Sequence, residues 1–145
     1  MNSRDDLLAV QIGLRGRFDD FRGAFERRED DACRVALADF RAHFTRWTAA
    51  EERILVPALS RASFPGRDPE RELRLEYVQI RELTRYLDSQ IAERAPVADV
   101  QGLVENLERR LAAHESEMER VYYPAAAPLL TAEEWRILSE SAPPP

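Results

Sequence analysis

A carboxylate and an imidazole fall at positions where helical spacing places core residues. Glu51 comes four residues after Trp47 and three before Ile54. His114 comes three residues after Leu111, on another apolar stripe. Burying either group costs free energy unless a partner replaces the lost water, and helical bundles build metal sites from such inward-facing side chains. Glu51 and His114 are therefore the first candidates for chemistry in this chain.

Further residues lie at matching heights on the other apolar stripes. Gln11 comes four residues after Leu7, and Tyr77 lies between Leu73 and Ile80. In antiparallel helices of equal rise, residues equally distant from the connecting turn lie at equal height. One layer of the core therefore receives a contribution from every helix. The predicted members are Gln11, Trp47, Glu51, Tyr77, His114 and Met118, with His43 one turn away.

Apolar residues recur at intervals of three and four over most of the chain, which predicts long amphipathic helices. The expected helices cover about residues 4–29, 32–61, 69–94 and 97–123. Pro57 is expected to kink or end the second of them. Thr131 and Glu134 form a capping box that predicts a short fifth helix over about 131–139. Short connections make neighbours antiparallel, so the predicted fold is all-α, an up-down-up-down four-helix bundle with a short C-terminal helix, in one domain over residues 1–145.

The composition excludes several classes of protein. The chain has 145 residues, a formal net charge of −6 and a single cysteine, Cys33. The negative charge argues against a general nucleic-acid binder, and one cysteine allows neither an intrachain disulfide nor a cysteine-based zinc site. No apolar run of about 18 residues occurs, so no membrane span is expected. These features predict a soluble, cytoplasmic protein.

Three segments resemble the hemerythrin-like, or HHE cation-binding, family. Residues 47–57 (WTAAEERILVP) look like the family's second-helix pattern, His-x-x-x-Glu-Glu followed by a proline. Residues 114–124 (HESEMERVYYP) look like its fourth-helix counterpart, and residues 76–83 (EYVQIREL) are similar to the Glu-His pattern of its third helix. The resemblance extends from Leu7 to Leu130. It implies a four-helix bundle, two iron ions bridged by carboxylates, and a role in O2, NO or iron sensing and storage.

The same resemblance implies that most iron ligands are replaced in this chain. Glu51 and His114 are retained. Gln11, Trp47 and Tyr77 stand where the family has histidines, and Met118 stands where it has an acidic residue. Two irons need about five or more protein ligands, so neither a di-iron centre nor O2 carriage on it is expected. We therefore expect, first, that this layer binds no cofactor.

Three arrangements of the layer remain open. In the first, a hydrogen-bonded network fills the core: Tyr77 donates to Glu51, His114 pairs with the same carboxylate, and Gln11 satisfies the remaining groups. In the second, Glu51, Tyr77 and His114 bind a single iron ion, with His43 within reach from one turn away. In the third, the layer is a small-molecule or haem-type pocket with histidine or methionine as axial ligand.

These arrangements lead to three hypotheses about function. The chain is a binding or sensory module without its di-iron centre, a metal-binding protein or metalloenzyme with one rebuilt iron site for O2- or NO-related chemistry, or a structural or interaction bundle. No nucleophile–base pair and no phosphate-binding loop occurs, so no residue is predicted to be catalytic. Gly13, Gly16 and Gly23 share one face of the first helix and could form a homodimer contact. No nucleic-acid or membrane partner is expected.

Overall fold

The computed structural model describes all residues from Met1 to Pro145, and it is entirely helical. The long helices are α1 (Arg4–Glu26), α2 (Asp30–Ser60), α3 (Pro69–Ala92) and α4 (Val97–Glu117). A π-helical turn, η1 (Met118–Tyr122), and α5 (Tyr123–Ala126) continue α4, and η2 (Ala127–Leu129) and α6 (Ala132–Ser141) follow. The predicted all-α bundle with a short C-terminal helix is thereby confirmed.

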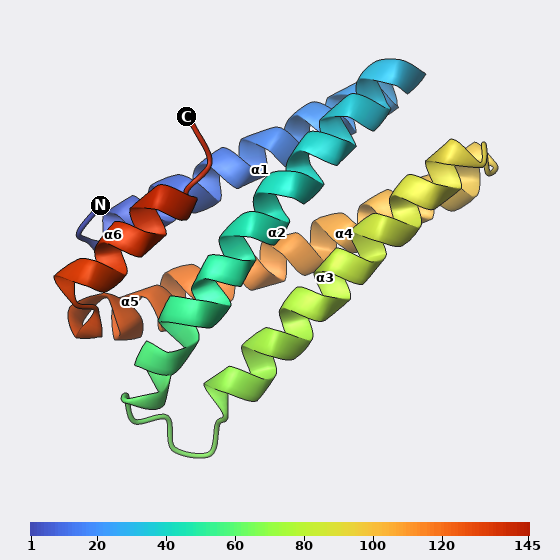
Figure 1. Cartoon of the computed structure of the whole chain (residues 1–145). Helices are drawn as coiled ribbons and strands as arrows, with labels where there is room; N and C mark the ends of the chain where they lie inside the picture. The colour runs from blue at the N-terminus through green and yellow to red at the C-terminus, as the bar shows by residue number, and fades with distance from the viewer.

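The four long helices run antiparallel, each beside the next along the chain (Figure 1). The long loop between α2 and α3 lies at one end of the bundle, and the short α1–α2 and α3–α4 turns lie at the other. α5 and α6 pack at the end where α1 begins, with α6 against α2. The helices therefore bring their central turns into a common layer, which is where the sequence places Glu51 and His114.

Local signals fix most of the helix ends. Ser3 and Thr131 form capping boxes at the starts of α1 and α6, and the Asp68 side chain caps α3 by accepting from the Arg71 amide, with Pro69 in the first turn. These are the residue types that satisfy free amides at helix N-termini. The capping box predicted at Thr131 is present.

The short turns after α1 and α3 share one geometry. Arg28 and Arg94 adopt left-handed backbone conformations, with φ of 58° and 57°. The amide of the residue that follows each arginine donates to a carbonyl five residues earlier, from Glu29 to Ala24 and from Ala95 to Gln90. This is the Schellman pattern, which usually has glycine at the left-handed position.

One expectation about the later part of the long helices is wrong. α2 continues past Pro57 to Ser60, in agreement with the expected span of about 32–61, so Pro57 does not end it. The fourth helix does not end before Pro124, because the helical path changes pitch at Met118 and continues through Pro124 to Ala126. A proline lacks an amide hydrogen but tolerates the first turn of a helix, and Pro124 lies in the first turn of α5.

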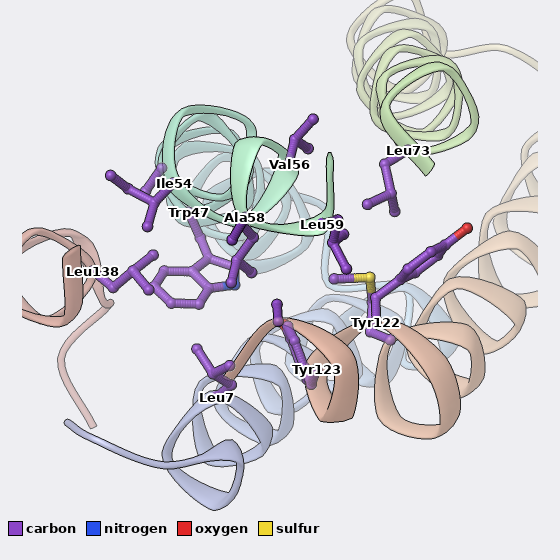
Figure 2. Close-up of a cluster of buried hydrophobic side chains, with 14 of the residues drawn as sticks. Leu7, Trp47, Ile54, Val56, Ala58, Leu59, Leu73, Tyr122, Tyr123 and Leu138 are labelled. Atoms are coloured by element: carbon purple, nitrogen blue, oxygen red, sulfur yellow. The ribbon is translucent and has the colours of Figure 1, made fainter. Parts of the chain in front are cut away.

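The core consists of two groups of buried apolar side chains. One lies toward the α2–α3 loop and includes Leu7, Trp47, Leu59 and Leu138. The other lies toward the short turns and includes Phe18 and many leucines and phenylalanines from all four helices. Figure 2 shows the first group, with the Trp47 indole directed from α2 toward Leu7 of α1 and Leu138 of α6. Glu51 and His114 belong to neither apolar group, although both are buried.

No helix of the structure has both the length and the apolar character needed to span a bilayer.

Candidate functional site

Glu51 lies in the core and has a tyrosine as its hydrogen-bond partner. Its side chain belongs to α2, and the residue is 1% exposed. The hydroxyl of Tyr123, on α5, donates to its Oε2 at 2.9 Å. Tyr123 is itself 1% exposed. A buried carboxylate therefore has one direct hydrogen bond to an equally buried phenol.

His114 is held by a second carboxylate. The imidazole is 5% exposed, and its Nδ1 lies 2.5 Å from Oε1 of Glu76 on α3. Two aromatic rings meet it edge-on: Tyr77 at 5.5 Å and Phe44 at 6.4 Å between centroids. These contacts fix the plane of the ring and leave Nε2 as the nitrogen that Glu76 does not engage.

A small cavity connects these groups. Its volume is about 20 Å³, and its polar wall includes Gln11, Trp47, Glu51, His114 and Tyr123. A cavity holds a water molecule once about 10–15 Å³ is open to its centre. The space therefore suits a ligand the size of a single water molecule or ion.

Two buried polar atoms beside Glu51 and His114 lack partners. Neither the indole Nε1 of Trp47 nor the hydroxyl of Tyr77 makes a hydrogen bond of good geometry, although both side chains are almost completely buried. Both act as nearby donors, because against the larger effect of burial Trp47 lowers the pKa of Tyr123 and Tyr77 lowers the pKa of Glu51. Native proteins leave few such groups unpaired, and an ordered water or ion often supplies the missing partner. Of the two residues, only Trp47 lines the cavity.

Burial dominates the titration of this layer. It raises the pKa of Glu51 from 4.5 to about 7, although His114 and the hydrogen bond from Tyr123 both favour the charged carboxylate. Burial, together with the nearby Glu51 charge, also raises the pKa of Tyr77 and of Tyr123 well above 10. The phenols therefore stay protonated near neutral pH, whereas Glu51 changes its charge there.

The remaining residues predicted for the layer are less closely grouped. Gln11 is half-buried, lines the cavity, and donates through Nε2 to the carbonyl of Glu115 at 2.9 Å. Met118 is fully buried in the apolar group that contains Trp47. His43 does not line the cavity: its Nδ1 lies 2.8 Å from the carbonyl of Asp39 on its own helix. The prediction that His43 reaches the layer from one turn away is therefore wrong.

The structure adds two pairings to the predicted hydrogen-bond network. Tyr123 donates to Glu51 at 2.9 Å, and His114 contacts Glu76. Against the larger effect of burial, His114 and the Tyr77 phenol both still lower the pKa of Glu51. Gln11 bonds a backbone carbonyl outside this group. Glu76 and Tyr123 were thus missed, although both occur within the segments that carry the family resemblance.

The π-helical turn explains why the spacing did not reveal Tyr123. Nine residues separate it from His114, and at about 100° per residue an α-helix would place the two on opposite faces. A π turn accommodates about one extra residue, which rotates the following segment back by about 100°. Tyr123 therefore points toward Glu51. Such turns commonly occur at functional sites.

These donors do not fit the two-iron centre that the resemblance implies. The layer offers the carboxylates of Glu51 and Glu76, one imidazole and phenols, and Glu76 is engaged by His114, whereas two irons need about five or more imidazole and carboxylate ligands. No group of three or more histidine, cysteine, aspartate or glutamate side chains lies close enough to hold a metal ion. By the resemblance, the indole of Trp47 stands where the family's second helix has a histidine.

Comparison with known families agrees with the resemblance. The model of the Hemerythrin HHE cation binding domain matches residues 5–126. The match spans nearly all of α1 and continues to the end of α5, and it includes each residue of the layer. Neither a curated protein nor a solved structure gives a significant match to the chain.

Proposed function

The chain belongs to the hemerythrin HHE cation binding domain family, and from that premise we propose that it is a binding or sensory module that has lost the di-iron centre. In place of that centre its core layer binds one small ligand. The module acts by occupancy of this layer, not by catalysis.

The cavity beside Glu51 and His114 is the observation that carries the proposal. Its volume of about 20 Å³ accommodates one water-sized ligand. The buried Trp47 side chain takes up space in the same layer. Among the described side chains, only Glu51 and His114 retain the ligand types that the resemblance implies.

Iron analysis tests the proposal. The purified chain, produced in iron-supplemented medium, is expected to hold fewer than two irons per chain. A variant that restores the family pattern, with Gln11→His, Trp47→His, Tyr77→His and Met118→Glu, is the matched control and is expected to hold about two irons if it folds. Two irons per chain in the unmodified protein would overturn the proposal.

A second candidate function is the binding of a single metal ion, with Glu51, Tyr77 and His114 as its predicted ligands. The contact between Glu76 and His114 favours this candidate. Metal-binding histidines usually donate their other ring nitrogen to a carboxylate or carbonyl, which orients the imidazole. Glu76 contacts Nδ1 in this way.

We also propose that the module is cytoplasmic and has no nucleic-acid partner, because its net charge of −6 disfavours a phosphate backbone. The homodimer remains a prediction. Cβ atoms added at Gly13 or Gly16 would meet nothing within 4 Å, which leaves room for a contact on this face, although Gly13 also lines a hollow with Pro143 to Pro145 of the C-terminal tail. Light scattering tests it, since a monomer at all concentrations would exclude this contact.

A further inference from the structure

We propose that the cleft lined by Arg28, Arg34 and Arg94, between the two short turns of the bundle, binds a small organic anion in which a carboxylate is joined to an apolar body. This site goes beyond the proposed function, because it shares no residue with the cavity beside Glu51. The apolar group that contains Phe18 extends from one site to the other, since it contributes Phe25 to the cleft and Phe44 to the cavity.

The cleft lies where the bundle divides into two helical hairpins. The α1–α2 pair and the α3–α4 pair each end in a short turn at the same end of the molecule (Figure 1). The space between the two turns has a volume of about 300 Å³, and residues of both turns line it. Pockets for small molecules typically begin at roughly this size. The cleft therefore suits an organic molecule, whereas the cavity beside Glu51 suits one water-sized ligand.

The floor of the cleft is apolar. Phe25, Cys33 and Val100 line it and are buried. Burial raises the pKa of the Cys33 thiol to about 11, so this side chain stays neutral and behaves as a small apolar group. Val97 also lines the cleft and is 49% exposed. A ligand with an apolar body would remove this surface from water, which favours binding.

Three arginines without a carboxylate partner surround the apolar floor. The guanidinium of Arg28 lies over the Phe25 ring at 5.1 Å from its centroid and donates to the Phe25 carbonyl. The side chains of Arg34 and Arg94 form neither a hydrogen bond nor an ion pair, whereas Arg136, on α6, pairs with glutamates. A guanidinium binds a carboxylate through two parallel hydrogen bonds. A carboxylate is therefore the group that these arginines fit.

The backbone conformations of Arg28 and Arg94 give a second, independent observation. Both residues are left-handed, with φ of 58° and 57°, at turn positions that usually have glycine. A Cβ atom is unfavourable in this conformation, and unfavourable backbone conformations are concentrated at ligand sites. The two turns thus place an arginine at the equivalent strained position, and both side chains line one cleft. Binding of an anion supplies a reason for arginine at positions where folding alone favours glycine.

Acidic side chains also line the cleft, but other positive charges offset them. Glu29 accepts hydrogen bonds from Arg27, which lies outside the cleft. Asp30 and Asp31 belong to the first turn of α2, where the partial positive charge of the helix N-terminus stabilises carboxylates. The three arginines therefore leave the cleft with an excess of positive charge.

Three probes with the same aromatic body test the charge of the ligand. Phenylacetate is an anion, phenylacetamide is neutral, and phenethylammonium is a cation. Binding of each to the unmodified chain is measured by isothermal titration calorimetry at pH 7. We expect phenylacetate to bind with a dissociation constant below about 1 mM. The other two probes are expected to bind at least about tenfold more weakly, because they lack the carboxylate.

The double variant Arg28→Gly/Arg94→Gly tests the two arginines without damaging the turns. It removes both guanidinium groups and replaces both left-handed residues with the one that suits this conformation. We expect at least about tenfold weaker binding of phenylacetate, with no decrease in the free energy of unfolding. Arginines with a purely structural role would give the opposite result, a loss of stability.

Arg109→Ala is the matched control, because it removes an exposed arginine of α4 that lies outside the cleft. It is expected to keep the phenylacetate affinity within about twofold. If the double variant is less stable than the unmodified chain, Arg34→Ala replaces it, since this substitution leaves both turns unchanged. Arg34→Ala is then expected to weaken phenylacetate binding, and an unchanged affinity would overturn the assignment.

Three results would overturn the proposed anion site. They are the absence of saturable phenylacetate binding, equal or tighter binding of phenethylammonium, and a stable double variant that binds phenylacetate as tightly as the unmodified chain. None of them bears on the proposed function of the core layer, which iron analysis tests.

Discussion

At the scale of the single residue, opposing effects act on the protonation of the Glu51 carboxyl group. Burial favours its neutral form, while His114 and the Tyr123 hydrogen bond favour its charged form, and burial is the largest effect. In the metal-free protein the pKa of Glu51 is therefore about 7. The unfolded chain, in which this carboxyl is exposed to water, has the ordinary value near 4.5. The difference links the protonation of one side chain to the stability of the whole fold.

The Glu51→Gln variant tests this link. Between about pH 4.5 and pH 7 the folded state retains a proton that the unfolded state has lost, so the free energy of unfolding falls as pH rises through this window. The slope is about 1.4 kcal/mol per pH unit, which amounts to roughly 3 kcal/mol in total. The contribution is fully present below pH 4.5 and lost above pH 7. Glu51→Gln is expected to remove this slope and to be more stable than the unmodified, metal-free chain at pH 8.

Urea denaturation at pH 5, 6, 7 and 8 measures the effect. Glu119→Gln, at an exposed position of the π turn, is the control and is expected to keep the slope of the unmodified chain. An unchanged slope in Glu51→Gln would show that another group causes the pH dependence.

At the scale of the helical elements, periodicity predicted the four long helices and the height of their central layer. Glu51, Tyr77 and His114 are buried as their spacing indicates, because a stripe repeated every three or four residues faces one side of an α-helix. The same rule fails at the turn from Met118 to Tyr122, where the pitch changes and Tyr123 rotates inward. Pairings such as Glu76 with His114 depend on rotamers and on small axial shifts, which spacing does not specify.

The backbone of the turn between α3 and α4 allows a prediction about stability. Arg94 has a left-handed backbone, which costs a residue with a Cβ atom about 1 kcal/mol relative to glycine. Arg94→Gly is therefore expected to raise the free energy of unfolding by up to about 1 kcal/mol. Arg94→Ala is the control, because alanine retains the Cβ strain and should give no gain. Equal stability of the two variants in urea denaturation would contradict the prediction.

Glycines within α1 make a second prediction at this scale. Gly13 lies in the middle of the helix, and a Cβ there would meet no atom within 4 Å. Gly13→Ala is expected to stabilise the monomeric chain by about 0.5–1 kcal/mol because alanine loses less backbone entropy in a helix.

Gly66, in the loop between α2 and α3, is the opposite case. Its backbone φ of 75° suits glycine, so Gly66→Ala is expected to destabilise the chain by a similar amount. Thermal denaturation measures the melting temperature of both variants. A change in the same direction for Gly13→Ala and Gly66→Ala would contradict the prediction.

At the scale of the whole molecule, the polar layer lies between two apolar groups, and polar and charged side chains link α1 to α4 beside it. These two helices approach each other less closely than sequence neighbours do. Arg15 of α1 crosses the gap, with Nη1 2.7 Å from Glu108 and Nε 2.9 Å from Glu115, and it also lines the cavity. Gln11 adds a hydrogen bond to the Glu115 carbonyl. Hydrogen bonds and ion pairs therefore join α1 to α4 at this side of the cavity.

Removal of Arg15 measures how much its contacts with Glu108 and Glu115 contribute to the stability of the fold. Its side chain is 20% exposed, and those of Glu108 and Glu115 are 29% and 23% exposed, so Arg15→Ala leaves two partly buried carboxylates without this partner. The expected loss is about 1–3 kcal/mol of unfolding free energy. Arg136 also bridges two carboxylates, but all three side chains are more than half exposed, and Arg136→Ala is expected to change stability too little to measure. Equal effects of the two substitutions in urea denaturation would show that burial of the α1–α4 ion pairs adds nothing to the strength of these contacts.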